Sequence, residues 1–87
     1  MNDVRIVIGH RGWVWVGEWT QEGDEVVLKR SKNIRVAGTT RGFGELVNGP
    51  LSGTKLHPVG TVRLHRLAVI ASYDCNPEKW SKALGRD

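Results

Sequence analysis

Three of the chain's four tryptophans, Trp13, Trp15 and Trp19, fall within one short alternating segment. In an extended strand, successive side chains point to opposite faces, so the three indole rings share one face and the valines between them share the other. A second apolar run, Glu25–Arg30, follows after a connection that contains glycine. Two such runs predict a β-hairpin with a wide loop. The hairpin commits the chain to a mostly antiparallel β fold.

Further strands are predicted where β-branched residues recur, at Val4–Ile8, Ile34–Ala37 and Thr61–Ser72. Within the last of these, Leu67–Ala71 is apolar on both sides, which is typical of a strand that is covered on both faces. The predicted fold class is therefore α+β but mostly β. We expect a small antiparallel sheet or a partly open barrel of about five strands.

Two short helices complete the predicted fold. The first covers about residues 40–48, where a threonine can cap the helix and a Gly-Pro pair ends it. The second lies in the tail, residues 74–87, where an asparagine cap is followed by a proline at the first helical position. Trp80 and Leu84 are expected to dock this tail helix on the sheet.

The chain length and composition indicate one small folded domain. The 87 residues suffice for a single domain 1–87, with a β-rich core in 1–73 and the tail helix in 74–87. A domain of this size has a small core, and we expect a homo-oligomer to compensate for it. Cys75 is the single cysteine, so no intrachain disulfide can form. Without a signal-peptide pattern or an apolar stretch of about 20 residues, we expect a soluble cytoplasmic protein with no membrane partner.

The charge of the chain indicates the kind of partner. Thirteen Lys and Arg against nine Asp and Glu give a net charge of +4, which favours phosphate-bearing or acidic partners. The same cations could instead form a solvated face that only keeps the protein soluble. Arg35 and Arg41 flank the start of the first helix, where the backbone N–H groups at Thr40-Arg41-Gly42 are suited to an anion.

The tryptophan stripe is expected to lie mainly in the core, because each indole buries a large apolar area. Trp19 is nearest to the hairpin loop and is the tryptophan that we expect beside a ligand. The residues predicted to bind the ligand are Arg35, Arg41, Arg11, Lys29, Lys32, Trp19 and His10.

The sequence lacks the patterns that catalysis needs. His10, His57 and His65 do not have the paired spacing of a metal site. Cys75 has no base beside it in the sequence, although a thiolate nucleophile needs one in space. No Ser-His-Asp pattern or carboxylate pair stands out. We therefore expect a protein that is not an enzyme and that holds neither a metal ion nor a cofactor.

Four segments follow one another in a distinctive order: Val14-Trp15-Val16-Gly17-Glu18, Glu25-Val26-Val27-Leu28-Lys29, the basic strand Lys32–Val36 and the glycine-bounded segment Gly38–Gly49. In this order of segments, the chain resembles a family of short phage and prophage proteins that lacks an assigned biochemical function. The likeness covers roughly residues 4–72 and departs from the family at Ile34–Ala37, where aromatic residues are usual. It implies a mobile-element origin, a location in the host cytoplasm and an accessory role against host machinery.

Three functions remain open at this point. The first is counter-defence by a non-catalytic protein that binds and sequesters an anionic nucleotide-like ligand. The second is a small β-module that binds nucleic acid and loses affinity steeply with salt. The third is an inhibitor that docks onto a host defence protein by a sheet edge or by its tryptophan-rich face. The modest charge of +4 and the lack of a dense basic cluster favour the first over the second.

Overall fold

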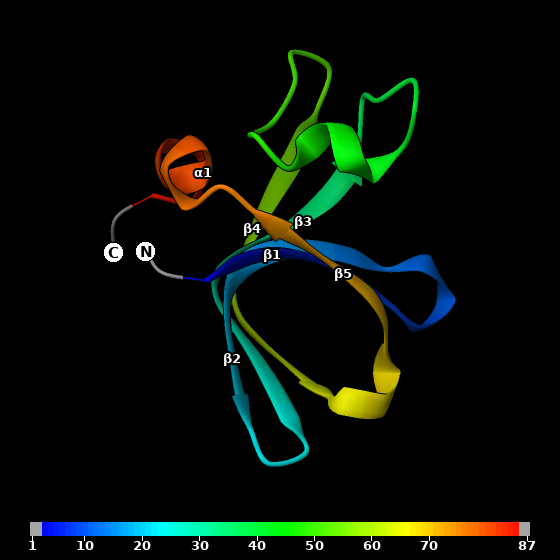
Figure 1. Ribbon diagram of the computed structural model, residues 1–87, viewed down its shortest axis with the longest axis vertical. Helices are drawn as coiled ribbons and strands as arrows, with labels where there is room; N and C mark the ends of the chain where they lie inside the picture. The colour runs from blue at the N-terminus through cyan, green and yellow to red at the C-terminus, as the bar shows by residue number, and fades with distance from the viewer. Residues whose placement is uncertain (1–2, 86–87) are drawn as a thin grey trace.

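The computed structural model describes residues 3–85, and residues 1, 2, 86 and 87 of the predicted core and tail lie outside the described part. Five antiparallel strands form one curved, open sheet in the order β4-β3-β2-β1-β5 (Figure 1). The strands are β1 (Val4–Gly9), β2 (Val14–Glu22), β3 (Glu25–Val36), β4 (Lys55–His65) and β5 (Val69–Cys75). The helical segments are the 3-10 turns η1 (His10–Gly12), η2 (Phe43–Leu46) and η3 (Arg66–Ala68), and the α-helix α1 (Pro77–Leu84). The predicted fold class is confirmed.

The register of the sheet sorts its side chains into two faces. Ile6 lies directly opposite Val16 on the neighbouring strand, and the two side chains therefore share a face. This face carries the main core cluster, to which Leu46 of η2 and Trp80 of α1 also belong. The main core cluster thus lies between one face of the sheet and these two helical segments. The opposite face is not wholly open, since Val7, which pairs with Trp15, is fully buried there.

Helix α1 begins as the sequence predicts. The Asn76 side chain accepts a hydrogen bond from the Glu78 N–H at 3.1 Å, and Pro77 occupies the first turn. Trp80 is fully buried, and its Nε1 donates to the Leu46 carbonyl at 2.8 Å. This bond joins α1 to η2 across the core, which confirms the docking role predicted for Trp80.

The other predicted helix, at residues 40–48, is shorter than expected and is not α-helical. It is η2, a single 3-10 turn at Phe43–Leu46. Gly42, which precedes the turn, has a φ of 108° and so lies outside the helical region. The two internal glycines of this segment raise the entropic cost of an α-helix, and the Glu45 carboxylate binds the backbone of the preceding bend instead.

The predicted strand Thr61–Ser72 is in fact parts of two strands. β4 begins earlier, at Lys55, and η3 then redirects the chain so that β5 pairs with β1 at the far side of the sheet. Leu67 and Ile70 are 71% and 64% exposed, so the expectation of a strand covered on both faces is wrong. Leu67 belongs to the turn η3 and not to a strand, and of the β5 residues Tyr73 and Cys75 pack with the main core cluster whereas Ile70 does not.

Candidate functional site

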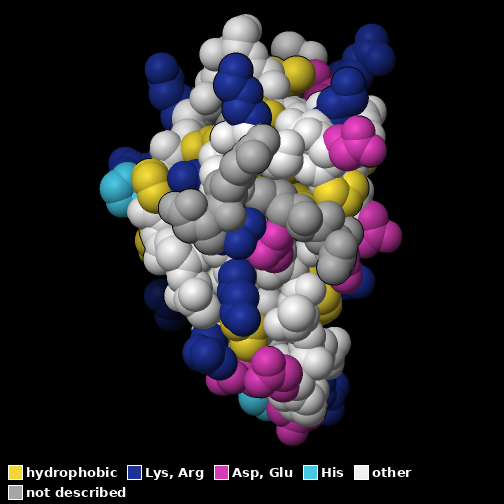
Figure 2. Space-filling view, turned by 90° about the vertical axis from the view of Figure 1, so that its left-hand side faces the viewer, with side chains coloured by type: hydrophobic (Ala, Val, Ile, Leu, Met, Phe, Trp, Pro, Cys, Tyr) yellow, Lys and Arg dark blue, Asp and Glu magenta, His cyan; other side chains and the backbone are white. Residues whose placement is uncertain are grey.

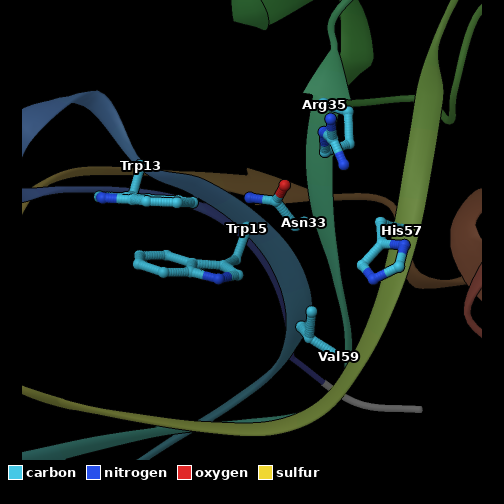
Figure 3. A pocket seen from close by; sticks show the side chains of 6 residues that line it. All are labelled: Trp13, Trp15, Asn33, Arg35, His57 and Val59. Carbon is cyan, nitrogen blue, oxygen red and sulfur yellow. The ribbon is translucent and has the colours of Figure 1, made fainter.

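A pocket of about 630 Å³ lies on the face of the sheet that does not carry the main core cluster (Figure 3). The register explains why distant residues meet there: Trp15 on β2 is opposite Asn33 on β3, and Asn33 is opposite His57 on β4. Cross-strand neighbours share a face, so these three side chains form one row. The residues that line the pocket are Trp13, Trp15, Asn33, Arg35, His57 and Val59.

The tryptophan side of the pocket is a stacked pair. The ring centroids of Trp13 and Trp15 are 6.3 Å apart, and the ring planes are inclined by 15°. Trp13 is 58% exposed and Trp15 is half-buried. Trp15 can lie flat here because β1 has a glycine beneath it: a Cβ at Gly9 would come within 2.8 Å of the indole. The pair presents a flat apolar surface to the pocket.

The expectation that the tryptophan stripe is mainly core is therefore wrong. Val14 and Val16, which alternate with the tryptophans on β2, fill the core instead and are 8% and 0% exposed. Both faces of β2 are apolar, so the sequence left the choice between them open. The choice is made by α1 and η2, which cover the valine face.

Asn33 forms the floor of the pocket between the tryptophans and β4. It is 9% exposed, and its Nδ2 donates a hydrogen bond to the Val14 carbonyl at 3.0 Å. This bond fixes the carboxamide, whose Oδ1 accepts none of the hydrogen bonds found between residues 3 and 85. The pocket thus contains one immobilised hydrogen-bond acceptor for a donor group on a ligand.

Arg35 and His57 line the pocket across from the stacked tryptophans (Figure 3). Both side chains are exposed. Arg35 takes part in none of the ion pairs within the described residues, so no carboxylate there competes for its guanidinium. A planar guanidinium suits bidentate recognition of phosphate or carboxylate groups. The pocket therefore combines an aromatic surface on one side with an anion-binding group on the other.

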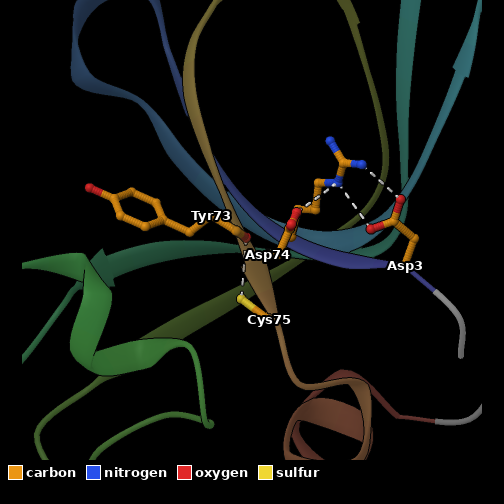
Figure 4. Close-up of polar contacts among 5 residues, drawn as sticks. Asp3, Tyr73, Asp74 and Cys75 are labelled. Carbon is orange, nitrogen blue, oxygen red and sulfur yellow. Dashed lines mark hydrogen bonds and ion pairs between the residues drawn. The ribbon is translucent and has the colours of Figure 1, made fainter.

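Of the residues predicted to bind a ligand, Arg35 alone lines this pocket. Trp19 lies on the same strand as Trp15, but the Arg5 guanidinium covers its ring at 4.3 Å from the centroid. Figure 4 shows the ion pairs that hold this arginine, with Arg5 Nε 3.0 Å from Asp3 Oδ1 and 3.4 Å from Asp74 Oδ1. One face of the Trp19 ring is thus already covered by a side chain of the protein itself.

Arg41 and its backbone also lie away from the pocket. The Glu45 carboxylate accepts hydrogen bonds from the Arg41 N–H and, at 2.9 Å, from the Thr40 N–H. The backbone groups that were expected to hold an external anion thus already bind a carboxylate of the same chain. His10 and Arg11 lie in the exposed turn η1, which precedes Trp13.

Lys29 and Lys32 lie at two other hollows, at the bulge in β3. A hollow of about 350 Å³ is lined by Glu18, Lys29, Arg30, Gly60 and Thr61. A smaller one of about 170 Å³ shares Arg30 and Gly60 with it, and includes Lys32. The predicted site residues are therefore divided among several places, and the structure does not bring them together.

Sequence reasoning missed five of the residues that line the main pocket. Two signals were available: Trp13 and Trp15 are adjacent on one face of the predicted hairpin, and Asn33 is two positions from Arg35 on one strand face. His57 and Val59 carried no local signal. They reach the pocket only because β4 pairs with β3 after the long connection between them.

The remaining chemistry of the chain is limited. Cys75 is buried, and burial raises the pKa of its thiol from 9.0 to about 11, so the thiol is protonated at neutral pH and is a poor nucleophile. Its Sγ lies 3.6 Å from the Tyr73 carbonyl (Figure 4). Between residues 3 and 85, no group of three or more His, Cys, Asp or Glu side chains could hold a metal ion. No helix in this part of the chain is long and apolar enough to cross a membrane.

Similarity to known proteins gives no further information about the site. Comparisons with protein-family models, with curated proteins and with solved structures found no match to this chain. The resemblance to short phage proteins, with the origin and role that it implies, stays a prediction. The pocket of Trp13, Trp15, Asn33, Arg35, His57 and Val59 is the strongest candidate site that the described residues form.

Proposed function

We propose that this protein binds a small nucleotide-like anion in the pocket between Trp13 and Arg35 and holds it without chemical change. The observation that carries the proposal is the stacked, partly exposed Trp13–Trp15 pair facing an arginine that has no carboxylate partner within the described chain. In an infected cell, such binding would lower the free concentration of a signalling nucleotide, which is how a phage accessory protein could counter a host defence.

The aromatic half of the pocket suits a nucleobase. Stacking of a base on an aromatic side chain contributes about 1–3 kcal/mol and tolerates different bases, because every base has a π face. Trp13 is 58% exposed and offers its ring without a rearrangement of the core. The fixed Asn33 Oδ1 can accept a hydrogen bond from an exocyclic amino group of the base.

The cationic half suits the phosphate. Hydrogen bonds to a charged group contribute about 1.5–3 kcal/mol, more than those between neutral groups. Arg35 can supply two such bonds, and His57 adds ring nitrogens on the same side of the pocket. A volume of about 630 Å³ lies within the range of about 300–1,000 Å³ that is typical of small-ligand sites.

The distribution of charge favours a small ligand over a long nucleic acid. On the face shown in Figure 2, the dark-blue Lys and Arg side chains are spread from top to bottom, with magenta acidic side chains between several of them. Three of the cations lie within 3.0 Å of a carboxylate: Arg5, Arg63 and Arg66. A nucleic-acid backbone needs a continuous track of cations to neutralise many phosphates at once.

The proposal is tested by titrating the purified protein with the four nucleoside monophosphates and with a short single-stranded oligonucleotide, while tryptophan fluorescence is recorded. We expect a nucleotide to quench the fluorescence saturably, and Trp13→Ala to weaken its binding by about 5- to 150-fold. Arg35→Ala should weaken it by about tenfold or more. Arg63→Ala is the matched control, because it removes an exposed arginine outside the pocket.

Three results would contradict the proposal. The first is unchanged affinity in both pocket variants, and the second is an equal loss in the control variant. The third is preferential binding of the oligonucleotide with a steep dependence on salt, which would identify a nucleic-acid module instead. Native mass spectrometry of the same samples reports the number of subunits and tests the expected homo-oligomer.

A further inference from the structure

Arg30 holds a backbone conformation that favours glycine. Its φ is +54°, in the left-handed region, and among the described non-glycine residues Arg11 alone shares this property. Arg30 lies at a bulge in β3, where the pairing with β4 shifts between Leu28 and Ser31. Glycine is the usual residue at a left-handed bulge position because a Cβ there is unfavourable. An arginine at such a point suggests that its side chain has a use.

The bulge changes where the cationic side chains point. In a regular strand, Lys29 and Arg30 would lie on opposite faces of the sheet. Here both line the same hollow of about 350 Å³, together with Glu18, Gly60 and Thr61, which we name the bulge groove. The adjoining hollow of about 170 Å³ shares Arg30 and extends the positive surface to Lys32.

The bulge is held in place from both neighbouring strands. On β2, Gly17 packs closely against it, since a Cβ at Gly17 would come within 2.9 Å of the Ser31 Cβ and 3.1 Å of the Lys29 carbonyl. On β4, the Gly60 carbonyl accepts a hydrogen bond from Ser31 Oγ at 2.5 Å. The packing of the sheet therefore fixes the groove, and its cations lie together before any ligand binds.

The charges of the groove are not balanced within the described chain. Arg30 Nη1 lies 3.6 Å from Glu18 Oε2, which is a loose contact for an arginine and a carboxylate. Lys29 and Lys32 take part in none of the ion pairs found there. Three cations thus share one carboxylate at the two adjoining hollows. Thr61, whose side chain carries a neutral hydrogen-bond donor, lines the same hollow.

We propose that the bulge groove is a second anion site, which takes a phosphate or diphosphate group through Arg30 and Lys29. The site is separate from the tryptophan pocket: Asn33 and His57 line that pocket, whereas their neighbours Lys32 and Pro58 pair with each other one register position away and line the smaller hollow. A phosphate oxygen pair matches the guanidinium of Arg30 and displaces its loose contact with Glu18.

The test uses inorganic pyrophosphate, which has no base to stack, and isothermal titration calorimetry. Arg30→Gly removes the guanidinium while giving the bulge the residue that its backbone favours. We expect this variant to bind pyrophosphate about tenfold more weakly or worse, with a melting temperature that is not lower than that of the parent chain. Arg11→Gly is the matched control, since it makes the same exchange in the same backbone region but lines neither the groove nor the tryptophan pocket.

The outcomes separate this proposal from the one made for the tryptophan pocket. Arg35→Ala, which removes the cation assigned to the phosphate in the tryptophan pocket, should leave the affinity for pyrophosphate unchanged. Arg30→Gly should leave the fluorescence response to a nucleoside monophosphate unchanged. Equal losses in Arg30→Gly and Arg11→Gly would show that net charge alone attracts the anion. That result, or an absence of saturable pyrophosphate binding to the parent chain, would overturn the proposal of a groove site.

Discussion

Gly9→Ala is expected to displace the Trp15 ring and nothing else. The backbone at Gly9 has φ of −101°, which any residue can adopt, so the substitution introduces no strain of its own. The added methyl group would lie 2.8 Å from Cζ3 of Trp15 and 3.7 Å from the Ala68 carbonyl. The second contact is ordinary, but the first requires the indole to move by at least about 0.6 Å.

The energetic effect has two opposing parts. Overpacking in a closely packed region costs about 1–3 kcal/mol, and the loss of stacking with Trp13 adds up to about 1 kcal/mol. Replacing glycine by alanine at an unstrained position stabilises by about 0.4–1 kcal/mol, because it restricts the unfolded chain. We therefore expect a net loss of about 1–3 kcal/mol in the free energy of unfolding. For a domain of this size, each kcal/mol corresponds to a fall in melting temperature of about 4–8 °C.

The decisive measurement is a double-mutant cycle with Trp15→Val, followed by urea unfolding and far-ultraviolet circular dichroism. Once the indole is absent, the cause of the destabilisation is gone and only the effect on the unfolded chain remains. Gly9→Ala should then be neutral or slightly stabilising, so its sign differs between the two backgrounds. If Gly9→Ala destabilises both backgrounds equally, the proposed contact between position 9 and the indole is not the cause.

Three further substitutions test other parts of the fold. Trp80→Ala removes the largest fully buried side chain and its bond to the Leu46 carbonyl, and should cost about 3–5 kcal/mol in urea unfolding; a cost below about 1 kcal/mol would contradict the assigned core. Asn76→Ala removes the N-cap of α1 and should lower the free energy of unfolding by about 1 kcal/mol, unlike Lys82→Ala near the end of the helix. Because burial raises the pKa of the Cys75 thiol from 9.0 to about 11, the folded protein holds this proton more tightly than the unfolded chain does. Stability should therefore fall as the pH rises from about 9 toward about 11, and Cys75→Ala should show a shallower fall of the melting temperature over that interval; equal slopes would contradict it.

The first hairpin was predictable from the sequence because alternation is a local property. The bounds of the later strands were not: Ile34–Ala37, predicted as a separate strand, is the end of β3 (Glu25–Val36), and Thr61–Ser72 is divided between β4 and β5. The tryptophan-valine segment and the run at Glu25–Arg30 pair as a hairpin in the structure. The buried face was not predictable, since both faces of β2 are apolar and the covering segments, η2 and α1, lie far away in the sequence. Tertiary packing thus decided whether the tryptophans or the valines of β2 are buried.

The candidate site was predictable only in part. Arg35 was identified from its charge and position, and the structure places it in the main pocket. The pairing of Asn33 with His57 depends on the register of β3 against β4, and a long connection between strands does not specify a register. Arg30 was not predicted as a site residue for a different reason. A bulge interrupts the alternation of side chains between the two faces of a strand, and the prediction of strand faces depends on that alternation.

The strand order places the last strand beside the first. β1 is the first strand to be made, yet one of its two edges stays unpaired until β5 arrives and the register from Val4–Cys75 to Ile8–Ala71 can form. During synthesis, the β1–β2–β3 meander can assemble early from local contacts, but it carries an open edge beside an apolar core face. That edge can recruit a strand of another nascent chain. Until β5 pairs with β1, this open strand edge therefore favours misassembly between chains.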